Sequence, residues 1–192
     1  MEKGIKISII LLLFFCIACS SDDDKLYGPE AVESNFKMNN KVYSTPFGHY
    51  QKDNSVNNVE DRYVIFLFNI DLIPITEEDG GILCSSLSDL NQGITIYLNS
   101  SEDNILAPGN YKYTNDSSAN SGFTGTVFHD AHVEGDFCET IEVNQLEISG
   151  GEFTVSKNEY IYTITYIFTS NDITIKGSYQ GELRETTFSN LL

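Results

Sequence analysis

The sequence predicts an all-β domain, an antiparallel β-sandwich of about eight to ten short strands. Two observations support this fold class. Apolar side chains alternate with a period of two, and turn-forming residues interrupt the alternation at short intervals. No window of a dozen residues carries the apolar stripe of an amphipathic helix. A calycin-like β-barrel is the alternative, because a meander of strands serves both architectures.

The C-terminal part of the chain has the clearest alternation. In residues 173–183, isoleucine, glycine, tyrosine and leucine alternate with polar side chains, as in a strand with one wet face. Residues 160–169 are β-branched or aromatic throughout, and residues 170–172 form a hairpin turn. Residues 152–157 and 141–148 also alternate. We therefore expect the four segments to form a four-stranded meander.

Earlier segments show shorter alternating runs. Residues 62–73 have apolar side chains on both faces, so we expect a central strand that is covered on each side. Residues 82–87 give only a weak pattern. The other expected strands are residues 36–38, 41–44, 94–98, 111–113 and 123–128.

Residues 1–18 have the order of a signal peptide. Lys3 and Lys6 form a positive region, and the stretch from Ile7 to Ala18 is apolar apart from one serine. Twelve residues are too few for a transmembrane helix, which needs about 20. The small residue Ala18 then stands directly before Cys19.

This ending resembles the lipobox of bacterial lipoproteins, in which signal peptidase II cuts before a cysteine whose thiol carries diacylglycerol. The resemblance implies that Cys19 is acylated, for example with palmitate, and anchors the mature chain in the lipid bilayer. One departure is Cys16, where the family usually has a branched aliphatic residue. Cysteine is apolar and similar in size to valine, so it suits this position.

The residues after Cys19 are polar and acidic. Ser20-Ser21-Asp22-Asp23-Asp24 resembles the export tag of surface lipoproteins in the Bacteroidota, which implies an outer-membrane protein exposed at the cell surface. Residues 19–35 read as a lipidated tether and residues 36–192 as a single domain. The opening residues 36–43 and the last two expected strands are similar to small all-β Bacteroidota lipoproteins of unknown function.

The net charge of the chain disfavours some classes of binding partner. The formal net charge is −17, and removal of residues 1–18, which carry a net charge of +1, leaves −18. Such a surface repels phosphate backbones, so we expect no nucleic-acid partner. The same charge disfavours peripheral binding to anionic lipid headgroups.

Two cysteines remain for the folded domain. Cys84 and Cys138 form an even pair in an exported chain, where disulfides are permitted. A bridge would close a loop of roughly 54 residues and stabilise the fold by about 4 kcal/mol in the chain-entropy model. Two separately buried thiols are the alternative, which the sequence leaves open.

The densest group of metal-ligand side chains is a weak candidate site. His129, Asp130 and His132 offer imidazole and carboxylate donors, but their spacing matches no zinc signature. A histidine pair spaced in this way points to opposite faces of a strand unless the chain turns at Ala131. His129 also reads as a half-buried histidine on the face of Phe123. We expect no bound cofactor. Acidic turns at residues 77–80 and 101–104 read as solvated turns.

The sequence carries no catalytic signature. Residues 177–181 place a serine in a strand without the following helix of a nucleophile elbow. Tyr160, Tyr162, Tyr166 and Phe168 share a face that suits either a sugar-stacking platform or a core, and the absence of tryptophan favours the core. We expect a non-enzymatic binding or assembly module with an envelope protein or glycan as partner. A carrier of a small apolar ligand is the alternative, and a hydrolase or metal-binding protein comes third.

Overall fold

The all-β class is confirmed by a computed structural model, which describes residues 33–53, 62–72, 89–99, 106–116, 122–134 and 139–186. The chain divides into two units, Met1–Ala31 and Val32–Leu192, and every described residue lies in the second. Within the described ranges the chain forms strands and no helix, so none there is long and apolar enough to cross a membrane.

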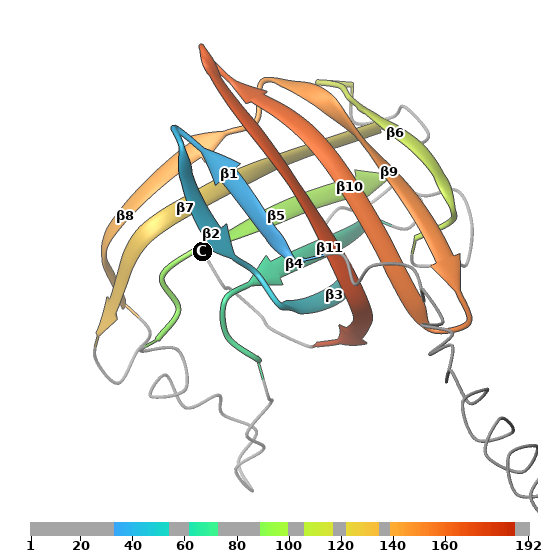
Figure 1. Ribbon diagram of the computed structural model, residues 1–192, viewed down its shortest axis with the longest axis horizontal. Coiled ribbons are helices and arrows are strands. Elements are labelled where there is room, and N and C mark those ends of the chain that lie inside the picture. The colour runs from blue at the N-terminus through green and yellow to red at the C-terminus, as the bar shows by residue number, and fades with distance from the viewer. Residues whose placement is uncertain are drawn as a thin grey trace, which may run out of the picture. The chain divides into compact units, whose positions relative to one another are not determined.

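Eleven strands belong to one sheet (Figure 1). Their bounds are β1 Asn35–Met38, β2 Lys41–Ser44, β3 Phe47–Asp53, β4 Arg62–Phe68, β5 Gly93–Asn99, β6 Gly109–Tyr113, β7 Gly122–Glu134, β8 Glu139–Glu147, β9 Gly150–Asn158, β10 Ile161–Ser170 and β11 Ile173–Glu185.

Eight of these strands close into a barrel. They follow the order β10-β9-β6-β7-β5-β4-β3-β11, and pairing between β11 and β10 completes the ring. The preferred sandwich is therefore replaced by the barrel alternative. Alternation reports which side chains face a core, but it does not distinguish a core between two sheets from a core inside one closed sheet.

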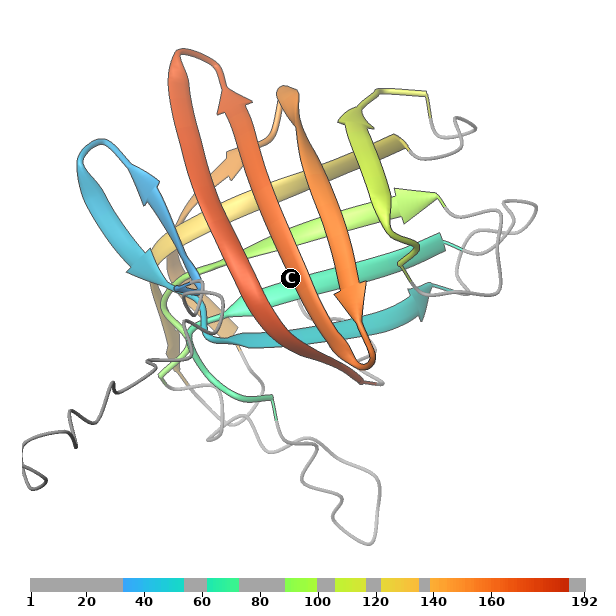
Figure 2. The same ribbon diagram turned by 45° about the vertical axis from the view of Figure 1, so that its right-hand side comes forward.

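The two longest strands make closure possible, because each shares one of its edges between two neighbours. One edge of β11 pairs with β10, and the other pairs with β1 at Lys176–Ser178 and with β3 at Leu183–Glu185. Likewise β7 pairs with β5 on one edge and with both β6 and β8 on the other. The β1–β2 hairpin and β8 thus extend beyond the ring (Figure 2).

Two contacts in the ring are parallel, which corrects the expectation of a purely antiparallel sheet. Strand β3 pairs with β11 over three residue pairs, and β6 pairs with β7 over two. We call the β3–β11 contact the seam. Such short pairings have few backbone hydrogen bonds, so side chains beside them matter for closure.

The expected four-stranded meander is wrong in one strand. Strands β9, β10 and β11 do form a meander, with Glu159 and Asn171 in left-handed backbone conformations at its two turns. Strand β8, however, pairs with β7, and β6 takes the place beside β9. The alternation within residues 141–148 gave no information about which strand they pair with.

Apolar side chains form two clusters. The larger one fills the barrel, and it includes Ile65 and Leu67 of β4. The smaller one lies on the opposite face of the same strand, where Phe66 and Phe68 pack with Leu72 and other apolar side chains. Strand β4 is therefore covered on both faces, as its apolar composition predicted.

Candidate functional site

Aromatic rings fill the centre of the barrel. The Phe123 ring lies 5.0 Å from that of Phe153 and 5.2 Å from that of Phe168, measured between centroids. Tyr166 stacks on Phe168 at 4.9 Å, and Tyr111 stacks on Phe153 at 4.7 Å. These rings come from four consecutive strands, β10, β9, β6 and β7, and they pack against one another on the inner face.

Many inward-facing side chains around these rings are fully buried. A water-sized cavity would leave accessible surface on the side chains that line it. At most 1 % of the surface is accessible for Ile65, Leu67, Ile94, Ile96, Leu98, Phe123, Val127, Phe153, Ile164, Phe168, Ile175 and Tyr179. These side chains are therefore packed against one another, which is the observation that bears on the carrier alternative.

The aromatic face of residues 160–168 belongs to this core. Tyr162, Tyr166 and Phe168 are buried, and only Tyr160 is exposed, at the turn between β9 and β10. The sugar-stacking interpretation of this face is wrong, and the core interpretation is confirmed.

His129 and Asp130 lie at a bulge in β7. The register against β8 shifts after His129, and Asp130 has a left-handed backbone with φ of 50°. His129 Nδ1 donates to the Asp130 carboxylate at 2.8 Å, and Lys41 Nζ lies 3.0 Å from the same carboxylate. The hydrogen bond from His129, and then that from Lys41, lowers the pKa of Asp130.

These contacts hold the β1–β2 hairpin against β7. Lys41 stands on β2, and the neighbouring Tyr43 ring lies 5.4 Å from the ring of His129. His132 lies beyond the bulge with an exposed side chain. Among the residues that the structure describes, no three His, Cys, Asp or Glu side chains gather closely enough to hold a metal ion. The His129–Asp130 pair reads as a hairpin clamp.

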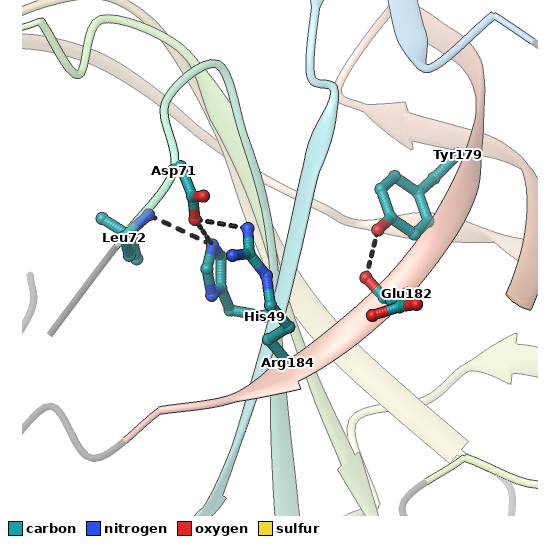
Figure 3. Close-up of polar contacts among 6 residues, drawn as sticks. All are labelled: His49, Asp71, Leu72, Tyr179, Glu182 and Arg184. Atoms are coloured by element: carbon teal, nitrogen blue, oxygen red, sulfur yellow. Dashed lines mark hydrogen bonds and ion pairs between the residues drawn. The ribbon is translucent and has the colours of Figure 1, made fainter. Parts of the chain in front are cut away.

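A second polar cluster lies beside the seam, and no sequence signal pointed to it (Figure 3). His49 of β3 and Arg184 of β11 are direct partners in the parallel pairing. Asp71, from the segment after β4, accepts a hydrogen bond from Arg184 and lies 3.4 Å from His49 Nε2. Asp71 thus pairs with Arg184 of β11 and lies beside His49 of β3.

His49 is buried in this cluster, with 1 % of its surface accessible. Its Nε2 accepts a hydrogen bond from the Leu72 backbone N–H at 3.2 Å, so Nε2 carries the lone pair and the ring is neutral. Burial lowers the pKa of His49 to about 4; the positive charge of Arg184 also lowers this pKa, and Asp71 opposes the shift. A neutral imidazole that already accepts a backbone hydrogen bond acts here as a structural group.

Tyr179 packs on the inner side of the same seam. Its hydroxyl donates to the Glu182 backbone carbonyl at 2.5 Å (Figure 3). A Cβ at Gly48 would lie 2.5 Å from the Tyr179 ring, so only glycine lets the ring lie against β3. Burial raises the pKa of Tyr179 to about 12, and the phenol stays protonated as a donor.

A groove on the outer surface is a further candidate. Beyond the Lys37–Lys176 pair, the β1–β2 hairpin and β11 are no longer paired, and a groove of about 550 Å³ lies there. Its lining residues are Lys37, Met38, Asn39, Asn40, Val42, Thr174 and Lys176. We call it the hairpin groove. It combines cationic, amide and aliphatic side chains.

Several predicted positions lie outside the described residues. They are Cys19, the pair Cys84 and Cys138, the weak strand 82–87 and the acidic turns at 77–80 and 101–104. Lipidation of Cys19 and the disulfide therefore stay predictions.

No protein-family model, curated protein or solved structure matches this chain.

Proposed function

We propose that this chain is a membrane-anchored lipoprotein of the bacterial envelope, exposed at the cell surface, and that its barrel is a non-catalytic binding or assembly module. The anchor follows from the signal-peptide order of residues 1–18 and from the lipobox ending at Cys19. The acidic residues 22–24 support export to the surface.

The packed side chains inside the barrel support the second part of the proposal, that the barrel is a binding or assembly module. A carrier needs a pocket that buries most of a small ligand, typically about 300 Å³ or more. The described inward-facing side chains are in contact with one another instead. Binding is therefore assigned to the outer surface.

The buried His49 also supports a non-catalytic module. Its imidazole is neutral and accepts a hydrogen bond from the Leu72 backbone N–H. A general base needs a lone pair within reach of a substrate proton. The lone pair on His49 Nε2 is occupied by a backbone N–H.

Native mass spectrometry of the full-length protein, purified from its envelope in mild detergent, tests the proposal against the carrier alternative. We expect the mass of the acylated chain with no additional apolar molecule of constant mass. A stoichiometric small molecule that denaturation in organic solvent releases would contradict the proposal. The same protein after an extraction that removes non-covalent lipids serves as the control. Detergent adducts vary in mass and number, which distinguishes them from a bound ligand of constant mass.

A further inference from the structure

Two lysines face each other at the closed end of the hairpin groove. Lys37 of β1 and Lys176 of β11 are direct cross-strand partners, and both side chains are exposed. Like charges placed directly opposite each other on a sheet are destabilising. Acidic residues outnumber basic ones by 28 to 11, yet within the described part of the chain neither lysine makes an ion pair or hydrogen bond. The pair is thus a concentrated positive site without an internal counter-charge.

Exposed aliphatic side chains flank this pair in the same row. Ile167 is the partner of Lys176 on β10, and Val42 is the partner of Lys37 on β2. Ile167 is 49 % exposed and Val42 is 55 % exposed, which places both among the few large apolar side chains in the described residues that reach solvent. Neighbouring strands lie about 4.8 Å apart, so Ile167 and Val42 are about 14 Å apart along the row.

The row continues past Ile167 to a carboxylate. Glu152 of β9 is exposed and is the partner of Ile167. A polyanion that follows the row would therefore meet Glu152 about 10 Å from Lys176, on a protein whose net charge is already strongly negative. The arrangement favours a ligand with a single acidic position over an acidic glycan with regularly repeated charges.

An extended peptide matches these spacings. Side chains at positions i, i+2 and i+4 of a strand point to the same side, and i to i+4 spans about 14 Å. We propose that the row of Val42, Lys37, Lys176 and Ile167 binds an extended segment of a partner protein with the pattern apolar–x–Asp/Glu–x–apolar. The carboxylate lies between the two ammonium groups, and the apolar side chains cover Val42 and Ile167. This rests on the proposed function and names its partner class.

The partner carboxylate supplies what the lysine pair lacks. It relieves the repulsion between the two ammonium groups and accepts a charge-assisted hydrogen bond from each. The neighbouring aliphatic contacts exclude water from these bonds, which strengthens them. Specificity then comes from the position of the acid relative to the two apolar residues, because only alternate residues of an extended chain face the sheet.

Fluorescence anisotropy with the full-length acylated protein in neutral detergent tests this. The probe is a fluorescein-labelled peptide with the core Leu-Thr-Asp-Thr-Leu. One control peptide replaces the aspartate by asparagine, and a second moves it to the off-face position in Leu-Asp-Thr-Thr-Leu. We expect both controls to bind about tenfold more weakly, since a hydrogen bond to a charged group contributes on this scale. Binding of the probe should also weaken as salt is raised.

Protein variants assign the site. K37Q and K176Q should each weaken binding of the probe by about tenfold or more, whereas K112Q should not change it. Lys112 is a matched control because it is an exposed lysine on the far side of Glu152 in the same row. Removal of one charge of a repelling pair should not lower the thermal midpoint, so circular dichroism melting separates lost binding from lost folding.

Three results would overturn the inference: no binding of the probe, equal binding of the asparagine peptide, or unchanged affinity in K37Q and K176Q. Tighter binding of polygalacturonate that depends on the same lysines would also overturn it, in favour of an acidic glycan. None of these results affects the native mass measurement, so failure of the partner class and failure of the proposed function are distinguishable.

Discussion

Replacing His49 with glutamine tests the electrostatics of the seam. The glutamine carbonyl oxygen reaches about as far as Nε2 of histidine, so it can still accept the Leu72 N–H. Glutamine cannot take up a proton. The variant therefore keeps the hydrogen bond at this position and removes the titration, which makes it a better probe than alanine.

The expected magnitude follows from the lowered pKa. His49 titrates at about 4 in the folded protein, against an ordinary value of 6.5. Between these values the unfolded chain binds the proton and the folded one does not, so stability rises with pH in this window. The contribution is fully present above pH 6.5 and is lost as pH falls towards 4. One pKa unit corresponds to about 1.4 kcal/mol, so the full shift corresponds to about 3.5 kcal/mol, of which about 2 to 3 kcal/mol is lost between pH 7.5 and pH 4.5.

Urea unfolding of the wild type and of H49Q at pH 7.5, 5.5 and 4.5 measures this. Many carboxylates titrate in the same range, so the informative quantity is the difference in unfolding free energy between the two proteins at each pH. We expect the unfolding free energy of H49Q minus that of the wild type to be about 2 kcal/mol larger at pH 4.5 than at pH 7.5. A difference that stays constant with pH would refute a buried, neutral His49 at the seam.

Three further substitutions test the packing of the core, the contact between β1 and β11, and the ion pair at the β1–β2 hairpin. Phe168→Ala should cost about 3–5 kcal/mol in urea unfolding, because its ring lies at the centre of the barrel and cannot be replaced by water. Gly177→Ala should destabilise by about 1–3 kcal/mol, since its Cβ would lie 2.4 Å from the Asn35 carbonyl oxygen and push β1 away from β11; a wild-type urea midpoint would contradict this contact. Lys41→Met should leave the urea midpoint nearly unchanged, because its ion pair with Asp130 is exposed, and a large loss would show that the hairpin clamp stabilises the whole barrel.

The alternation of apolar and polar residues predicted where strands lie and which of their faces are buried. It predicted the strands of the C-terminal meander and the double coverage of β4, because apolar side chains must lie wherever a face is buried. It missed β3, where glycine stands at inward-facing position 48 and buried His49 stands on the other face. A strand whose buried positions are not aliphatic gives no period-two signal.

The sequence alone could not predict which residues become neighbours across the sheet. Lys37 and Lys176 are far apart in the chain, and only the register between β1 and β11 makes them neighbours. The same holds for His49, Arg184 and Asp71, which meet because the barrel closes at β3 and β11. The sequence around a single histidine in a polar segment does not indicate that its side chain is buried. The His129–Asp130 cluster was visible as a motif, but its partner Lys41 came from the fold.

Membrane anchoring through Cys19 is the central claim of the account, and an intact mass measurement tests it most directly. The full-length chain and its Cys19→Ala variant are expressed in a bacterium with the lipoprotein pathway, and both are extracted in detergent. We predict that the wild type lacks residues 1–18 and carries diacylglycerol with additional acyl mass on Cys19, while the variant carries no lipid. An unprocessed wild-type chain, or one cut at another position without lipid, would contradict the account.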